Sequence, residues 1–273
     1  MKLATIQIDG QTRAARVEGS RYVLLDFADV GEVLSQPDWR DLAQADGETI
    51  DADGVRLLPV VLKPSKILCL SRNYAAHAAE GGNAPPPHPD IFVKFAASMI
   101  GAYDDIPMPT VSEKLDWEAE LAVIVGTGGR DIPREQALDH VAGYSVSNDV
   151  TVRDWQHRTQ QWTAGKAWDG LTPLGPHLVT ADELPPGGAG LGIRCSVDGR
   201  VWQDSTTDHM VFDVPTVIAD ISRFTRLEPG DVILTGTPEG VGAAQRPQVF
   251  LAPGQTVTVW IEGVGETKNH IVG

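Results

Sequence analysis

One stretch of this sequence joins a cluster of acidic residues directly to an apolar β-type segment. Residues 116–126 read DWEAELAVIVG, with three carboxylates in the first five positions. Alternate side chains of a β-strand share a face, so Glu118 and Glu120 are expected to point the same way. Two buried carboxylates side by side repel each other and lose hydration, so either a cation lies between them or one is protonated. A hard divalent cation meets this need, because Mg²⁺, Mn²⁺ and Ca²⁺ prefer oxygen ligands.

The residues leave two readings of this stretch open. At an exposed sheet edge both glutamates would be solvated, and no metal would be needed. A third carboxylate favours the metal site, because Asp149 follows an apolar run at residues 141–147 that is predicted to form another strand. An acidic side chain in that place is a suitable third ligand for a hard cation.

A short alanine-rich segment carries a candidate acid–base pair. Residues 74–80 read YAAHAAE and have high helix propensity. The i, i+3 spacing of His77 and Glu80 places both side chains on one helical face, where the carboxylate would orient the imidazole and raise its basicity. An exposed pair without a catalytic role is the alternative. The glycine- and proline-rich run at 81–89 is interpreted as a mobile lid or as a long surface loop.

Further segments carry groups that suit anionic ligands. Lys166 lies in an otherwise uncharged stretch, either semi-buried against an anion or on the surface. Lys94, on a predicted strand at 91–95, faces either an anionic ligand or solvent. Residues 235–242 read TGTPEGVG and offer backbone N–H groups and two hydroxyls to a carboxylate or a developing oxyanion. The P-loop lysine spacing is missing, which disfavours nucleotide binding.

The charge balance limits the partners of this chain. It has 22 basic and 37 acidic residues and a net charge of −15, which argues against nucleic acid or an anionic membrane as a partner. Cys69 and Cys195 lie among apolar neighbours and indicate small buried residues in a reducing compartment. Residues 1–8 alternate like a strand rather than a signal peptide, and no apolar run approaches transmembrane length. A cytoplasmic protein is therefore expected.

The pattern of elements predicts a mainly β protein with some α-helix. Residues 1–64 are predicted to form a small β-rich accessory domain, with strands at 3–8, 12–17, 22–25 and 55–62 and a helix at 30–43. Residues 65–273 are predicted to form the catalytic domain. Within it we expect a hairpin that turns at Asp198 and Gly199, a helix at 214–224 and a last strand at 255–261.

Taken together, these motifs resemble the fumarylacetoacetate hydrolase family, as in its bacterial acylpyruvase and 2-hydroxyhepta-2,4-diene-1,7-dioate isomerase-like members. The resemblance runs from about Lys63 to the C-terminus. The segments that carry it are RNY at 72–74 with the following HAAE, DWEAEL at 116–121, NDV at 148–150, RDWQ at 153–156, GK at 165–166, TGTP at 235–238 with GVG at 240–242, and IEGVG at 261–265. Each motif is weak alone, but their shared order is specific.

The resemblance implies a mixed β-sandwich or β-roll core that is usually dimeric, so a homodimer is expected. It implies a divalent metal, Mg²⁺ or Mn²⁺ with Ca²⁺ as a third option, held by Glu118, Glu120 and Asp149. The residues that it implies as catalytic are His77, Glu80 and Lys166. The residues that it implies as substrate contacts are Arg72, Arg153, Gln156, Gly236 and Thr237. Trp117 and Trp168 stand where relatives usually have Tyr or Phe, and they are expected to reshape the pocket wall.

The activity that the resemblance implies is hydrolysis of a C–C bond in a small 2,4-dioxo acid, such as an acylpyruvate or fumarylpyruvate. His77, held by Glu80, would activate the water that attacks the distal carbonyl. The same scaffold is compatible with an isomerase, a decarboxylase or a dehydratase that acts on a related oxo acid. A non-catalytic, metal-dependent binding protein is the alternative from a different class.

Overall fold

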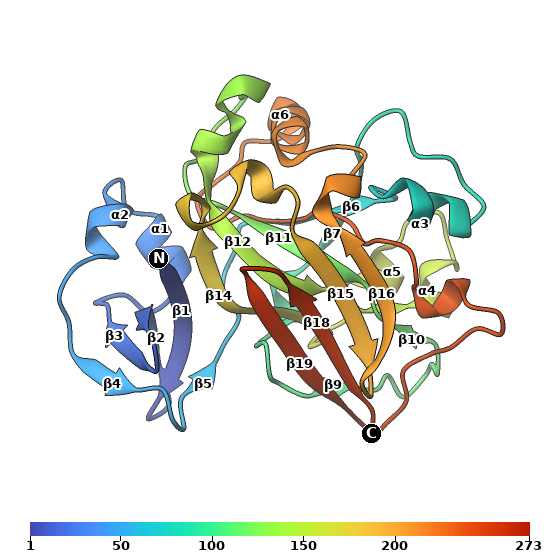
Figure 1. Cartoon of the computed structure of the whole chain (residues 1–273), viewed down its shortest axis with the longest axis horizontal. Coiled ribbons are helices and arrows are strands. Elements are labelled where there is room, and N and C mark those ends of the chain that lie inside the picture. The colour runs from blue at the N-terminus through green and yellow to red at the C-terminus, as the bar shows by residue number, and fades with distance from the viewer.

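A computed structural model describes all 273 residues and confirms the mainly β fold class (Figure 1). A large mixed sheet and a smaller sheet contact each other through their central strands, and a hydrophobic core lies between them. Both cysteines are free and buried, as predicted. No helix combines the length and the apolar character needed to cross a membrane.

The large sheet contains most of the chain's strands. In spatial order they are β4 (Thr49–Asp51), β3 (Arg21–Leu24), β2 (Gln11–Glu18), β1 (Lys2–Ile8), β14 (Thr172–Thr180), β12 (Val141–Asn148), β11 (Ala119–Val125), β17 (Val232–Leu234), β6 (Ile67–Ser71) and β7 (Asp90–Lys94), with β5 (Arg56–Leu57) beside β1 and β8 (Met99–Ile100) beside β14. The small sheet runs β16 (Arg200–Thr206), β15 (Gly192–Val197), β18 (Thr256–Ile261), β19 (Gly265–Val272) and β9 (Ile106–Pro107). A separate ladder joins β10 (Leu115–Asp116) to β13 (Thr151–Val152).

The helices are short and lie around the sheets. They are α1 (Val30–Leu34), α2 (Trp39–Leu42), α3 (Ala75–Glu80), α4 (Arg153–Gln156), α5 (Thr163–Lys166) and α6 (Val214–Phe224). Single 3₁₀ turns cover Ala96–Ser98, Ala181–Glu183, Pro186–Gly188, Thr207–His209 and Gly242–Ala244, and a longer one covers Arg134–His140. The predicted helix at 214–224 is confirmed as α6, which begins where the Asp213 side chain accepts the Thr216 N–H.

Strand β11 is central because its two faces enter different hydrophobic cores. Leu121 and Val123 pack in the core between the sheets, whereas Ala122 and Ile124 pack in a second core that includes side chains of α1 and α2. A strand that is covered on both faces has a continuous apolar sequence rather than alternating apolar and polar residues. The acidic start of this stretch is therefore carried to the end of a fully buried strand.

Some predicted elements differ from the structure for identifiable reasons. The helix predicted at 30–43 is two helices, α1 and α2, because Pro37 lies between them and cannot continue the first. The strand predicted at 55–62 is limited to β5, since Pro59 has no N–H to donate to a ladder. The strand predicted as the last, 255–261, is followed by β19, whose buried positions include the polar Thr267 and Asn269 and so gave no hydrophobic alternation.

The N-terminal strands continue the large sheet. Lys2 pairs with Val179 and Leu3 pairs with Leu178, so β1 hydrogen-bonds to β14 of the central region. In Figure 1 these strands lie together at the blue end of the molecule, beside β14. The division into domains at residue 64 stays a prediction.

Strand β14 carries a half-buried histidine that should make folding stability depend on pH. Burial, and to a smaller extent the charge of Lys2, lower the pKa of His177 from 6.5 to about 4. His177 therefore binds a proton near pH 6.5 in the unfolded chain but only near pH 4 in the folded protein. As the pH falls through this window, we expect protonation of this residue to lower the free energy of unfolding by up to about 3 kcal/mol. Above pH 6.5 we expect no such effect.

Denaturant unfolding of His177→Gln and of the wild type, above and below that window, measures this effect. The variant should lose less stability on acidification than the wild type. His88→Gln, which removes an exposed histidine, is the matched control and should behave like the wild type. Equal acid sensitivity in His177→Gln and the wild type would contradict the prediction.

Candidate functional site

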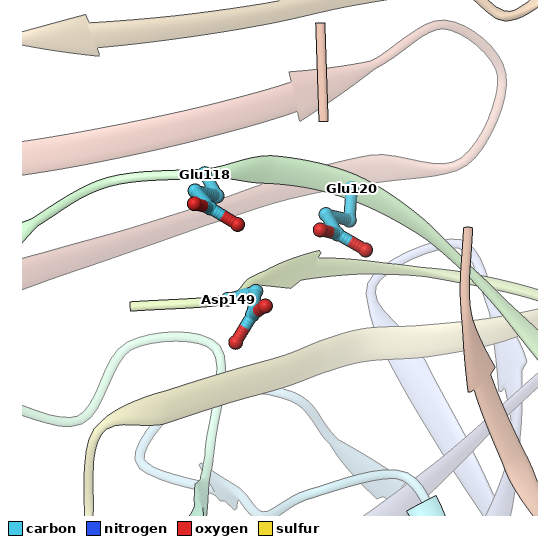
Figure 2. Close-up of side chains that lie close together, drawn as sticks. All are labelled: Glu118, Glu120 and Asp149. Atoms are coloured by element: carbon cyan, nitrogen blue, oxygen red, sulfur yellow. The ribbon is translucent and has the colours of Figure 1, made fainter. Parts of the chain in front are cut away.

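Three carboxylates meet where β11 and β12 come together (Figure 2). Glu118 immediately precedes β11, Glu120 lies in it, and Asp149 follows β12. One oxygen from each carboxylate lies within 4.8 Å of the others, and all three residues are buried. The predicted proximity of the two glutamates is confirmed. The alternative of an exposed edge strand is wrong, because β11 lies inside the large sheet.

Hydrogen bonds hold the backbone and side chains of these acids in place. The antiparallel register puts Ala119 opposite Asn148, which brings the acidic ends of the two strands together. The Glu118 N–H donates to Asn148 Oδ1 at 2.9 Å. The Gly236 N–H donates to the Glu120 carboxylate at 2.8 Å. The acids are therefore positioned by the fold itself, as a preorganised site requires.

Two buried lysines bind the acids directly. Lys166 Nζ lies 2.7 Å from Glu118 and 2.7 Å from Asp149, so it is buried against anions and is not a surface lysine. Lys94 Nζ lies 2.5 Å from Asp149 and is also buried. The open question of whether Lys94 faces an anion or solvent is thus settled in favour of the anion.

A buried arginine connects the acids to the glycine-rich loop. Arg153 Nε donates to Asp116 at 2.7 Å, and the guanidinium lies 2.7 Å from Glu118. Asp116 also accepts the N–H groups of Gly242 at 2.7 Å and Ala243 at 2.9 Å. Asp116 was not among the predicted site residues, because a loop 126 positions along the chain supplies these partners and no local pattern signals such a contact.

The cluster contains one more carboxylate than it contains cations. Its acids are Asp116, Glu118, Glu120 and Asp149, and its cations are Lys94, Arg153 and Lys166.

Glu120 is the member of this cluster that has no cationic partner. Burial and the neighbouring charges of Asp149 and Glu118 raise its pKa well above the usual range. Burial would raise the pKa of Glu118 as well, but the charges of Lys166 and Arg153 lower it to about 2. A divalent cation at the three acids would stabilise the ionised form of Glu120, which no protein cation neutralises, so the residues present fit a metal.

The His77–Glu80 pair forms as predicted, on helix α3. His77 Nδ1 and Glu80 Oε1 are 2.8 Å apart. Because the carboxylate accepts, Nδ1 carries the proton and the lone pair of Nε2 is free. The other oxygen of Glu80 accepts the Gly240 N–H at 2.9 Å, which joins α3 to the glycine-rich loop. The pair can therefore act as an oriented general base.

Most of the predicted site residues line one pocket of about 590 Å³. These residues are Arg72, His77, Glu80, Glu118, Arg153, Gln156, Lys166 and Thr237. Residues 81–83 of the glycine-rich run also line it, while the mobility of a lid there stays a prediction. Gly236 does not line the pocket and uses its N–H on Glu120, so its contact with substrate stays a prediction.

The pocket has walls that the sequence did not indicate. Arg246 lines it from the loop after the GVG motif, where a single basic residue gave no signal. Trp162 and Phe92 form an aromatic wall with ring centroids 5.7 Å apart. The expectation that Trp117 and Trp168 reshape the pocket is wrong, because neither lines it. These two indoles pack against other tryptophans instead.

Comparison with known proteins gives consistent matches over nearly the whole chain. The family model for the C-terminal region of fumarylacetoacetate (FAA) hydrolase matches residues 66–272. The mitochondrial oxaloacetate tautomerase of Xenopus laevis is 42% identical over 249 residues, which is 90% of this chain and 77% of that protein. Two solved structures each cover 100% of this chain and 99% of their own: the fumarylacetoacetate hydrolase of Exiguobacterium antarcticum, with a TM-score of 0.89 and 36% identity, and the 5-carboxymethyl-2-hydroxymuconate delta-isomerase of Mycobacterium smegmatis, with a TM-score of 0.84 and 32% identity.

Proposed function

The chain belongs to the fumarylacetoacetate hydrolase family and is an enzyme that acts on an oxo acid, and we propose that it interconverts the enol and keto forms of a small 2-oxo diacid. The substrate would be of the oxaloacetate class, for which the Xenopus relative is named. Tautomerisation needs one group that moves a proton between carbon and oxygen, together with fixed positive charge near the enolate. His77 and the basic side chains of the pocket meet these two needs.

The bonding of the glycine-rich loop at 235–242 is the observation that favours proton transfer over hydrolysis. Hydrolysis of a C–C bond passes through a tetrahedral oxyanion, which needs hydrogen-bond donors. The sequence allowed the N–H groups of this loop to bind either a carboxylate or such an oxyanion, and those of the three glycines donate to carboxylates of the protein itself. The pairs are Gly236 with Glu120, Gly240 with Glu80, and Gly242 with Asp116.

His77 is the group placed to move the proton. Its Nδ1–H is held by Glu80, so Nε2 takes a proton from the carbon beside the oxo group. Glu80 stabilises the imidazolium that forms, and Nε2 then gives the same proton to the enolate oxygen. Lys166 and Arg153 contribute fixed positive charge next to the substrate oxygens. No proton is gained or lost overall, as an isomerisation requires.

Glu118, Glu120 and Asp149 would hold the metal, for which Mg²⁺ or Mn²⁺ is proposed. When bound, such a cation acts as a Lewis acid that polarises the oxo group and neutralises charge on the enolate. The homodimer and the cytoplasmic location stay predictions, and the Xenopus relative is a mitochondrial protein.

Hydrolysis of a 2,4-dioxo acid is the second candidate, and the size of the pocket favours it. About 590 Å³ is more than a four-carbon diacid fills, so an acylpyruvate and an attacking water would both fit. In that reaction His77 Nε2 would take its proton from the water rather than from carbon.

An assay with freshly dissolved enol-oxaloacetate and Mg²⁺ tests the first proposal. Loss of enol absorbance should be faster with enzyme than without it, and a chelator should abolish the difference. Pyruvate must be measured in the same reaction, because its release would indicate decarboxylation instead. Acetylpyruvate, assayed in parallel, should release no pyruvate. Pyruvate release from acetylpyruvate, with no effect on the oxaloacetate enol, would establish the hydrolase and refute the tautomerase.

A further inference from the structure

A buried glutamine of the small sheet connects the metal-ligand strand to the pocket. Gln203 lies in β16 and has no exposed surface. Its Oε1 accepts the Ala119 N–H at 3.0 Å, at the start of β11. Its Nε2 donates to Thr237 Oγ1 at 2.8 Å and to the Pro238 carbonyl at 2.8 Å.

These partners determine which way the amide of Gln203 points. The backbone N–H of Ala119 can only donate, and the carbonyl of Pro238 can only accept. The NH₂ group must therefore lie on the side of Thr237. As a result the oxygen of Thr237 accepts the bond from Gln203, and the hydroxyl hydrogen has to point elsewhere.

Thr237 lines the pocket, and its hydroxyl hydrogen points away from Gln203. The hydroxyl donates to no acceptor in the protein, because its one hydrogen bond is the bond that it accepts from Gln203. A hydroxyl can either donate or accept, and the oxygens of an anionic oxo acid can only accept. A threonine whose oxygen is already engaged by a donor is thus set to donate to the ligand.

We propose that Gln203 is a positioning residue that presents the Thr237 hydroxyl as a hydrogen-bond donor to a carboxylate or enolate oxygen of the substrate. This inference rests on the proposed function, because it requires that the pocket bind an oxo acid. Gln203 acts through Thr237 and touches no ligand itself. Its contact with Ala119 uses Oε1, whereas its contact with Thr237 uses Nε2, so the two roles can be separated by substitution.

Gln203→Glu is the variant that separates them. The new side chain has the same shape and keeps an acceptor for the Ala119 N–H. It replaces the NH₂ group by an oxygen, which accepts the Thr237 hydroxyl and so withdraws that donor from the pocket, and it also gives up the bond to the Pro238 carbonyl. Thr237→Val removes the hydroxyl itself, with little change of volume.

Calorimetric binding of oxalate in saturating Mg²⁺ measures the effect in a double-mutant cycle. Oxalate is chosen because its two coplanar carboxylates resemble the enolate of a 2-oxo acid. Each single variant should bind oxalate about 10- to 100-fold more weakly, as expected for loss of a hydrogen bond to a charged group. The double variant should bind no more weakly than Thr237→Val, because both changes remove the same donor.

Gln248→Glu is the control for added negative charge, since Gln248 lines the pocket without contacting Thr237. Its effect on oxalate should add to that of Thr237→Val. Wild-type affinity in Gln203→Glu, or an effect that adds to that of Thr237→Val, would overturn the proposal. If Gln203→Glu does not fold, Gln203→Met takes its place in the same cycle with Mg²⁺ affinity measured alongside, because methionine also gives up the acceptor for the Ala119 N–H. A loss of oxalate affinity at unchanged Mg²⁺ affinity then supports the proposal, and wild-type oxalate affinity overturns it. Turnover plays no part in the cycle, so an enzyme that leaves every oxo acid unchanged would refute the proposed function and not this inference.

Discussion

Glu120→Gln is expected to remove metal binding while leaving the metal-free protein at least as stable as the wild type. The variant loses one of three carboxylate ligands, so Mg²⁺ affinity should fall by more than the roughly 10- to 100-fold that outer-shell changes cause, and turnover should fall with it. In the absence of metal the same change removes a buried carboxyl group that has no cationic partner and whose ionisation is unfavourable. Glutamine still accepts the Gly236 N–H, so the local bonding is kept.

Calorimetry with Mg²⁺ and thermal unfolding in chelator measure the two effects on one preparation. Wild-type protein should gain thermal stability when Mg²⁺ is added, and Glu120→Gln should not. Glu113→Gln is the matched control, because it removes the same charge from an exposed position of the segment before β11. Unchanged Mg²⁺ affinity in Glu120→Gln would show that the three acids are not the metal site. A large loss of stability in chelator would show that Glu120 has a structural role.

His77→Ala is expected to lower turnover by about 10²- to 10⁴-fold, the usual contribution of a positioned general base. Mg²⁺ affinity and thermal stability should stay at wild-type values, because His77 lies on α3 and contacts none of the three proposed metal ligands. Glu80→Gln should have a smaller effect on turnover, since the imidazole remains present and loses only its charged partner. Steady-state turnover of the oxaloacetate enol by each variant checks this order.

His88→Ala, in the loop that follows α3, is the control for a general effect of histidine removal near the pocket. Full turnover in His77→Ala would mean that another group moves the proton. The other histidine that lines the pocket is His157, so a loss confined to His157→Ala would transfer the assignment to that residue.

The two variants also separate the contributions of the metal and the base. Glu120→Gln should lose metal and rate together, whereas His77→Ala should lose rate alone. A loss of metal in both would mean that α3 and the acids are coupled. The bond between Glu80 and Gly240, in the loop that also contacts Glu120 through Gly236, is the route by which such coupling would occur.

The features that the sequence alone determined are those set by short-range periodicity. The two-residue repeat of a strand placed Glu118 beside Glu120, and the helical repeat placed His77 beside Glu80. Both pairs form because each depends only on the local backbone conformation. For the same reason the hairpin turn at Asp198 and the helix at 214–224 were predicted correctly.

The pairing of groups that are distant in the sequence depends on the tertiary structure. In the folded protein Lys94 pairs with Asp149. The glycine N–H groups of the 235–242 loop donate to Glu80, Asp116 and Glu120. The partner of a hydrogen-bond donor or acceptor cannot be predicted from the local sequence, because that partner depends on how the two sheets pack. Gln203 is an example: it contacts Ala119 across 84 positions, and the Ala119 N–H together with the Pro238 carbonyl sets the direction of its amide.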